Sequence, residues 1–137
     1  MYTLQQRVGF AHCDPAGIVF YPRYFEMINT SVERWFSDAL GYSFAQMHVR
    51  DKVGVPTVSI ETQFHAPSYL EDLLTFELSL RALGHKSADV VIDVHCANAK
   101  RVSVVLTLVF VELSAARPHS QPWPEQLRQK MLAFVRT

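Results

Sequence analysis

The residues best suited to chemistry lie in one stretch, residues 12–24, which reads His-Cys-Asp-Pro-Ala-Gly-Ile-Val-Phe-Tyr-Pro-Arg-Tyr. This stretch holds one carboxylate, Asp14, and one glycine, Gly17, just before Pro22. Proline suits the first position of a helix, because the amide it lacks would have no partner there. Backbone N–H groups at such a helix start are unpaired and lie at the positive end of the helix dipole. A carboxylate beside these donors can attack an acyl group while the donors stabilise the resulting oxyanion.

Local chemistry leaves several readings of this stretch open. Asp-Pro and Gly are also typical of an ordinary turn. If Asp14 is reactive, it can attack the carbonyl and form a mixed anhydride that water hydrolyses, or it can act as a general base toward water. Gly17 either keeps a side chain away from the acyl group or provides a positive φ.

Hydrophobic periodicity predicts the elements that position this turn. Residues 2–10 alternate like a half-buried strand, and residues 22–40 place their apolar side chains on one helical face. Gly41 is well placed to end that helix. Four further runs predict strands in an order that suggests a meander, over residues 58–65, 74–82, 88–96 and 102–113.

The connections and the C-terminal part follow from the same pattern. The sequence Gly-His-Lys-Ser at residues 84–87 predicts a hairpin turn, and residues 43–51 predict a short helical turn. The run 102–113 is apolar at nearly every position, so we expect both of its faces to be covered. A proline-rich connector over 117–124 precedes a final helix over 125–136. One long helix can be wrapped by a curved antiparallel sheet built from these strands.

Size and composition restrict the function classes. A chain of 137 residues fits one domain, residues 1–137, with one substantial core. Its 13 basic and 13 acidic residues form no block that would suggest binding to nucleic acid or to a membrane surface. No segment resembles a signal peptide or reaches bilayer length, and the two cysteines do not make a disulfide framework, so we expect a cytoplasmic protein. The histidines lack metal-ligand spacing, and we expect no metal and no cofactor.

The stretch from Asp14 to Tyr24 resembles the signature of the 4-hydroxybenzoyl-CoA thioesterase family of hot-dog-fold proteins, which carry Asp-x-x-Gly followed by Tyr-Pro-x-Tyr. The similarity extends from the strand before Asp14 to about Leu113. It implies an α+β hot-dog fold, in which a curved antiparallel five-stranded sheet wraps around a long central helix, plus a C-terminal helix. It also implies a homodimer or homotetramer with active sites at the subunit interface.

The resemblance further implies hydrolysis of an acyl-CoA, either small and aromatic (4-hydroxybenzoyl-like) or short-chain, to the free acid and CoA. Asp14 would be the nucleophile or general base, Tyr21 would supply its backbone N–H to the oxyanion, and Gly17 would shape the loop. The resemblance implies that Phe20 and, from the opposing subunit, residues 55–58 with Thr57 flank the acyl pocket. It implies that His85, Lys86 and Ser87, supplemented by Lys100 and Arg101, approach the nucleotide of CoA. Three of these assignments have purely structural alternatives, which are core packing for the Tyr21 ring, an ordinary strand start at Thr57 and a solvated turn at 85–87.

Two other functions remain open at this point. The chain could act on acyl carrier protein instead of CoA, or it could be a non-catalytic acyl-CoA-binding or regulatory module. Release of a thiol from acyl-CoA substrates separates the enzyme from the module.

Overall fold

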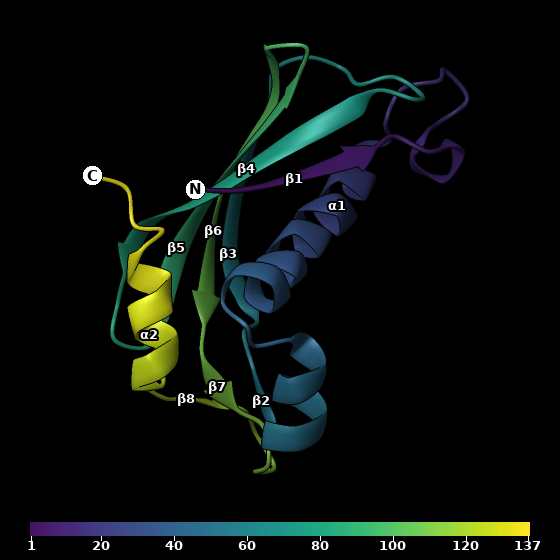
Figure 1. The fold of residues 1–137 in the computed structure, drawn as a ribbon. Helices are drawn as coiled ribbons and strands as arrows, with labels where there is room; N and C mark the ends of the chain where they lie inside the picture. The colour runs from purple at the N-terminus through teal and green to yellow at the C-terminus, as the bar shows by residue number, and fades with distance from the viewer.

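One long helix lies across the inner face of a curved antiparallel sheet (Figure 1). The computed structural model describes residues 1–137. The sheet has the order β1-β4-β5-β6-β3, and its strands are β1 (Tyr2–Arg7), β3 (Thr57–Phe64), β4 (Leu73–Leu83), β5 (Ser87–Cys96) and β6 (Ala99–Val109). The central helix is α1 (Tyr21–Arg34), and α2 (Glu125–Leu132) lies near the C-terminus. The α+β hot-dog arrangement implied by the resemblance is therefore confirmed.

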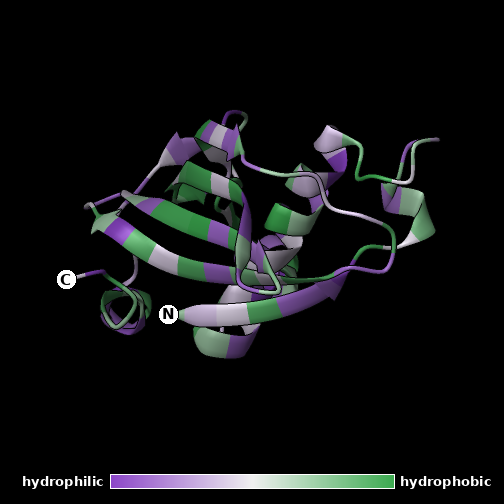
Figure 2. Cartoon of the chain, turned by 90° about the horizontal axis from the view of Figure 1, so that it is seen from above, coloured by the Kyte–Doolittle hydropathy of each residue, from purple (hydrophilic) through white to green (hydrophobic).

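Alternation along the strands builds the core between the sheet and α1. In β4, Leu74, Phe76 and Leu78 have no exposed surface, while the residues between them are half-buried. The bands of green and purple along the strands in Figure 2 follow this alternation. Because successive side chains of a strand point to opposite faces, one face of the sheet is apolar and packs against the helix.

The helix α1 presents its apolar face to this sheet, and the chain then continues into a wider, π-helical turn. Its buried residues recur at intervals of three and four and are Tyr24, Met27, Ile28, Ser31 and Val32. The chain continues into η2 (Trp35–Ala39), a π-helical turn in which Trp35 and Phe36 are both fully buried, with ring centroids 5.0 Å apart. Gly41, at φ 67°, follows it. The predicted extent of the helix is confirmed, with a π-helical last turn that its periodicity did not indicate.

The predicted meander is wrong for one strand. The strands β4, β5 and β6 pair in sequence, but β3 pairs with β6 and not with β4. The connection over residues 65–72 therefore crosses the ends of β6 and β5 to reach β4. Periodicity shows which face of a strand is buried, but it does not show which neighbour the strand pairs with, and this explains the error.

Other boundaries also differ from the predictions. The run 102–113 is buried on one face only, because its alternate residues in β6 are half-buried on the outer face of the sheet. This run breaks after Val109, and a second small sheet joins β2 (Val53–Gly54), β7 (Val111–Glu112) and β8 (His119–Ser120). The first strand ends at Arg7, before the 3₁₀ turn η1 (Phe10–His12).

The last helix is shorter than predicted because the chain after it bonds to the sheet. The Leu80 N–H donates to the Phe134 carbonyl, and the Arg136 N–H donates to the Leu80 carbonyl, each at 2.8 Å. These bonds replace the continuation of α2 with an extended segment beside β4. The helix therefore stops at Leu132.

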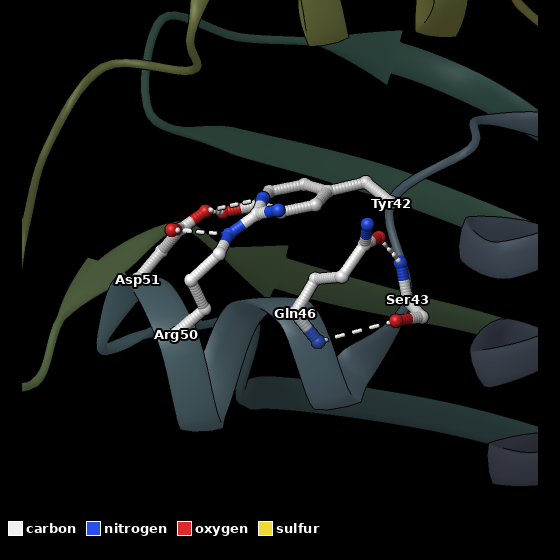
Figure 3. A network of polar contacts seen from close by, with 5 residues as sticks. All are labelled: Tyr42, Ser43, Gln46, Arg50 and Asp51. Carbon is white, nitrogen blue, oxygen red and sulfur yellow. Dashed lines mark hydrogen bonds and ion pairs between the residues drawn. The ribbon is translucent and has the colours of Figure 1, made fainter.

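The predicted helical turn over 43–51 is confirmed as η3 (Gln46–Asp51). Its start is capped reciprocally: the Gln46 N–H donates to the Ser43 hydroxyl at 3.1 Å, and the Ser43 N–H donates to the Gln46 side-chain oxygen at 2.8 Å (Figure 3). Such a pair satisfies two backbone donors that a helix start leaves free. At the other end of the turn, the Tyr42 hydroxyl donates to Asp51 at 2.5 Å, and Arg50 reaches the same carboxylate at 2.8 and 3.1 Å.

The contacts of Asp51 with Tyr42 and Arg50 make the free energy of unfolding depend on pH in the acidic range. The Arg50 guanidinium and then the Tyr42 hydroxyl lower the pKa of Asp51 from 3.8 to about 2. A carboxyl whose folded pKa lies below its unfolded value stabilises the fold above the unfolded value, and this contribution is lost as the pH falls through the folded pKa. We expect Asp51→Asn to have a weaker dependence of unfolding free energy on pH between about 4 and 2, measured by urea denaturation. Asp93→Asn, on the outer face of the sheet, is the control. An identical dependence in wild type and Asp51→Asn would contradict the assignment.

Candidate active site

Asp14 lies at the tip of a short hairpin that leads directly into α1. The Cys13 and Val19 backbones form an antiparallel bridge, and the Phe20 N–H donates to the His12 carbonyl at 2.9 Å. The Asp14 N–H closes the tip by donating to the Ile18 carbonyl at 2.9 Å. This Asp14 turn, residues 13–19, therefore folds back onto the start of the helix.

The Asp14 carboxylate keeps one oxygen free of protein donors. The Ala16 N–H donates to Asp14 Oδ1 at 2.8 Å, and no donor in the chain contacts Oδ2. Gly17 stands at φ 80°, where an L side chain is strained, although a Cβ added there would meet open space. The turn therefore requires glycine for its backbone conformation, and within one subunit no crowding adds to that requirement.

The first residue of α1 offers an unpaired backbone donor. Phe20, in an extended conformation, is the N-cap of the helix, and Tyr21 begins it. Pro22 therefore occupies the second helical position and not the predicted first one. The Tyr21 N–H donates to no acceptor in the chain. A backbone donor of this kind can stabilise the oxyanion of an acyl-transfer reaction.

Two depressions flank this arrangement. One, of about 360 Å³, is bounded by Phe10, Cys13, Asp14, Pro15, Gly17 and Leu70. The other, of about 330 Å³, includes Tyr21, Tyr24 and Phe64. The Tyr21 ring is 59% exposed and meets the Phe64 ring edge-on at 6.2 Å, so it is not a core side chain, whereas Tyr24 is buried. Phe20 is also half exposed, at 47%.

The structure separates the remaining predicted residues from Asp14 within one chain. Phe64, which contacts Tyr21, ends β3 on the side of Asp14, whereas Thr57 begins β3 at the other end. A strand of this length spans about 25 Å. The turn 84–87 lies at the Thr57 end too, since Ser87 pairs with Val109 and Thr57 with Leu108 (Figure 1).

Hydrogen bonds from side chains of the C-terminal segment hold the 84–87 turn. Arg128 donates to the Gly84 carbonyl at 2.6 Å, and the Trp123 indole N–H donates to the Ser87 carbonyl at 3.0 Å. The side chains of His85 and Lys86 are exposed and make no hydrogen bond or ion pair. This turn is therefore fixed through its backbone, and both basic side chains are available to a ligand.

An apolar groove of about 320 Å³ lies between α1 and the Thr57 end of β3. Its lining residues are Phe25, Ile28, Asn29, Val32, Phe44, Val55, Pro56, Thr57, Ile60, Leu106 and Leu108. Asn29 and Thr57 supply the polar side chains of this lining. A mostly apolar cleft with a few polar groups is typical of a small-molecule site.

Sequence reasoning missed Asn29 and misassigned Arg101. Asn29 follows Phe25 by one helical turn, and this spacing could have placed it in the groove. Arg101 was grouped with the nucleotide-binding residues, but its side chain is 14% exposed and pairs with Asp72 at 2.9 Å on the Asp14 side of the sheet. Lys100 pairs with Asp93 at 3.6 Å on the same side. Neither residue therefore supplements the 84–87 turn within one chain.

No helix of the chain is both long and apolar enough to span a bilayer. The structure also contains no group of three or more His, Cys, Asp or Glu side chains arranged to hold a metal ion.

Known proteins resemble this chain in both sequence and structure. A 4-hydroxybenzoyl-CoA thioesterase from Pseudomonas sp. strain CBS-3 is 35% identical over 86 residues, which are 62% of this chain and 61% of that protein. The chain thus aligns with less than two thirds of this relative's length. The solved structure of the 4-hydroxybenzoyl-CoA thioesterase of that strain has a TM-score of 0.86 at 26% identity, covering 94% of this chain and 97% of the other.

A gentisyl-coenzyme A thioesterase, BH1999, is similar to a comparable degree. Its structure has a TM-score of 0.83 at 26% identity and covers 93% of this chain and 99% of the other. The model of the thioesterase-like superfamily matches residues 8–131, which include the Asp14 turn, four of the five strands of the main sheet (all but β1) and most of α2. The resemblance seen in the Asp14–Tyr24 signature is confirmed, and this chain belongs to the thioesterase-like superfamily.

Proposed function

We propose that this chain is an acyl-CoA thioesterase that releases a free carboxylic acid and CoA, with Asp14 as its nucleophile. The observation that carries the proposal is that two groups without hydrogen-bond partners stand on the short hairpin and on the first residue of the helix it leads into. Asp14 Oδ2 accepts no hydrogen bond, and the Tyr21 N–H donates none. These are the two groups that attack on a thioester and stabilisation of its oxyanion require.

The reaction then proceeds in two balanced steps. Asp14 Oδ2 adds to the thioester carbonyl carbon, and the carbonyl oxygen becomes an oxyanion that accepts the Tyr21 N–H. Collapse breaks the carbon–sulfur bond, the CoA thiolate leaves, and a mixed anhydride joins the acyl group to Asp14. Water hydrolyses the anhydride, which releases the acid and a proton and restores the carboxylate.

A direct attack suits this geometry better than activation of water. The Ala16 N–H bonds to Asp14 Oδ1 at 2.8 Å and holds the carboxylate in place, while Oδ2 stays free to add to a carbonyl carbon. Single-turnover hydrolysis in ¹⁸O-labelled water distinguishes the two routes. Attack of water on the Asp14 side of the anhydride leaves label in the Asp14 carboxylate, whereas direct attack of water on the thioester leaves all the label in the acid.

The acyl group that we propose is a small aromatic ring. Two relatives named for 4-hydroxybenzoyl-CoA and gentisyl-CoA support an aromatic acid. The groove beside Thr57 supports it as well, because an apolar slot with an amide from Asn29 and a hydroxyl from Thr57 suits a ring that carries a polar substituent. A short aliphatic acyl group would fill less of this groove.

We further propose that two copies of the chain share each site. β3 meets only β6, so its other edge is free, and Val58, Ile60 and Phe64 on it are 61%, 42% and 50% exposed. An unpaired edge with apolar side chains is a pairing surface, and antiparallel pairing of β3 with itself has two-fold symmetry. This pairing puts Thr57 of a second copy opposite Phe64, which already touches Tyr21. The groove and the 84–87 turn of one copy then approach Asp14 of the other, in a homodimer or a tetramer built from it.

The exposed Lys86 side chain should contribute to CoA affinity. We expect Lys86→Ala to raise KM about fivefold to tenfold with kcat unchanged, since one charge-assisted contact to a phosphate is lost. The dependence of KM on salt should weaken as well. Arg81→Ala removes a positive charge that is already paired with Asp89 on the outer face and serves as the control. An unchanged KM in Lys86→Ala would leave the 84–87 turn without a role in binding.

The experiment that tests the function is thiol release from a panel of acyl-CoAs, followed with a chromogenic thiol reagent. We expect turnover of hydroxybenzoyl-CoA substrates and slower turnover of short aliphatic ones. Turnover of these acyl groups only when they are attached to acyl carrier protein would show that acyl carrier protein, and not CoA, is the carrier. Tight binding of acyl-CoA without thiol release from any donor would favour a non-catalytic module and contradict the proposal.

We also propose that residues 1–137 work as one domain in a reducing compartment such as the cytoplasm. A single apolar cluster joins the sheet, α1 and α2, which supports one cooperative unit. Cys13 and Cys96 are both free thiols, which suits a reducing environment.

A further inference from the structure

The 65–72 loop, which joins β3 to β4, is held by two arginine side chains of the sheet. Arg7 of β1 donates to the Glu71 carbonyl at 2.8 Å, and Arg101 makes the larger set of bonds. Arg101, near the start of β6, donates from Nη1 to the Pro67 carbonyl at 2.9 Å, to the Ser68 hydroxyl at 3.2 Å and to Asp72 at 2.9 Å. Arg101 thus reaches both halves of a loop that crosses two strand ends, and its backbone carbonyl accepts the His65 and Ala66 N–H groups at 2.8 and 3.3 Å. Its side chain is 14% exposed, so water competes little for these bonds.

Asp72 completes this cluster from within the loop. Its carboxylate accepts the Tyr69 N–H at 2.9 Å in addition to Arg101. The Tyr69 N–H and then Arg101 lower the pKa of Asp72, so it stays ionised and paired at neutral pH. The Arg101–Asp72 pair therefore holds the bend between Pro67 and Asp72, together with the backbone bonds that join Glu71 and Asp72 to Val8 at 2.8 Å each.

The same loop carries the Asp14 turn on its other side. The Val19 N–H donates to the Ser68 carbonyl at 2.9 Å, and the Leu70 N–H donates to the Gly17 carbonyl at 3.1 Å. Ile18 and Tyr69 form an antiparallel bridge between these two bonds. Residues 17–19 of the Asp14 turn are thus hydrogen-bonded to the 65–72 loop, which Arg101 holds.

The tip of the Asp14 turn has little else to fix it. Val19 is buried in the core and Cys13 packs against it, whereas residues 14–18 are not buried, and η1 contributes no buried side chain. Apolar packing therefore holds the two ends of the turn but not its tip. The backbone bonds to the 65–72 loop and the return into α1 place the tip, which carries Asp14.

We propose that Arg101 is a positioning residue, which fixes the 65–72 loop and through it places the Asp14 carboxylate relative to the Tyr21 N–H. The inference rests on the proposed thioesterase function. It goes beyond that function by assigning to a side chain on the sheet, outside both depressions beside Asp14, the alignment of the reacting groups.

Arg101→Met tests this role, because it keeps an unbranched stem and removes every donor. We expect kcat to fall about 30- to 100-fold with KM within about twofold, since misplacing a reactive group by about 1 Å has effects of this size. Arg101→Lys keeps the charge and three N–H donors and should recover most of kcat. Arg81→Met, which breaks a more exposed Arg–Asp pair without any bond to the 65–72 loop, should leave kcat unchanged.

Hydrogen exchange supplies a readout that does not need turnover. In Arg101→Met, peptides covering residues 13–20 and 65–72 should lose protection, while peptides from α1 and β5 keep wild-type protection. Wild-type protection at 13–20 in Arg101→Met would overturn the inference. A fall in activity that matched only the loss of folded protein, measured by circular dichroism, would overturn it too. If the wild-type protein hydrolysed no acyl thioester, the proposed function would fail alone, and the exchange data would still decide whether Arg101 fixes the Asp14 turn.

Discussion

Replacing Asp14 by asparagine should lower kcat by about a thousandfold or more, while KM and the affinity for free CoA stay close to wild type. The amide keeps the size of the side chain and can still accept the Ala16 N–H, so the turn should keep its shape. It cannot add to a carbonyl as a carboxylate does. Steady-state kinetics on the best substrate of the panel, with thermal unfolding in parallel, measures both expectations.

Two control variants test whether the loss of kcat is specific to the carboxylate at position 14. Asp93→Asn removes a half-buried carboxylate on the outer face of the sheet, where it pairs with Lys100, and should keep wild-type kcat. Asp14→Glu keeps the charge but lengthens the side chain in a turn closed by short backbone bonds, and should recover little. Retention of more than a tenth of the activity by Asp14→Asn would remove Asp14 from the reaction.

Two inactive variants should restore activity when they are produced together. Asp14→Asn removes the proposed nucleophile, and Thr57→Trp fills the groove, which we expect to lower kcat/KM about a hundredfold. If each site takes Asp14 from one copy and Thr57 from another, a random mixture has intact sites at about a quarter of all positions. Coexpression in equal amounts should therefore return about a quarter of wild-type activity, in a dimer and in a tetramer alike.

The same coexpression experiment distinguishes a shared site from a site that one copy of the chain holds complete. Thr57 is exposed, so tryptophan there should not disturb the core, and light scattering of each variant checks that its assembly is unchanged. If one copy held a complete site, no combination of these two chains would contain an intact one. Activity of the coexpressed sample equal to the average of the two variants would then contradict the shared site.

Local pattern predicted much of what surrounds Asp14. The Asp-Pro-Ala-Gly turn, the unpaired amide at the helix start and the long helix follow from residue types and spacing, and Gly17 indeed has a positive φ. The strand alternation predicted which side chains of β4 and β5 are buried. These features depend on near neighbours in the chain, which is why a sequence reveals them.

The features that were missed depend on contacts between distant segments. Nothing in the β3 pattern indicates that it pairs with β6, so neither the crossing of the 65–72 loop nor the position of Arg101 beneath it could be predicted. The separation of Thr57 from Asp14 within one subunit agrees with the expectation that the Thr57 region reaches the pocket from the opposing subunit. The pairing of the strands adds that the 84–87 turn lies at the same end of the sheet as Thr57.

The most direct test of the account is a crystal structure of Asp14→Asn with its acyl-CoA substrate bound. We predict a thioester oxygen about 3 Å from the Tyr21 backbone nitrogen, and the side chain of residue 14 against the same carbonyl carbon. The 84–87 turn that meets the CoA phosphates should belong to a second subunit. A thioester carbonyl bound away from the Tyr21 amide, with residue 14 facing solvent, would contradict the account.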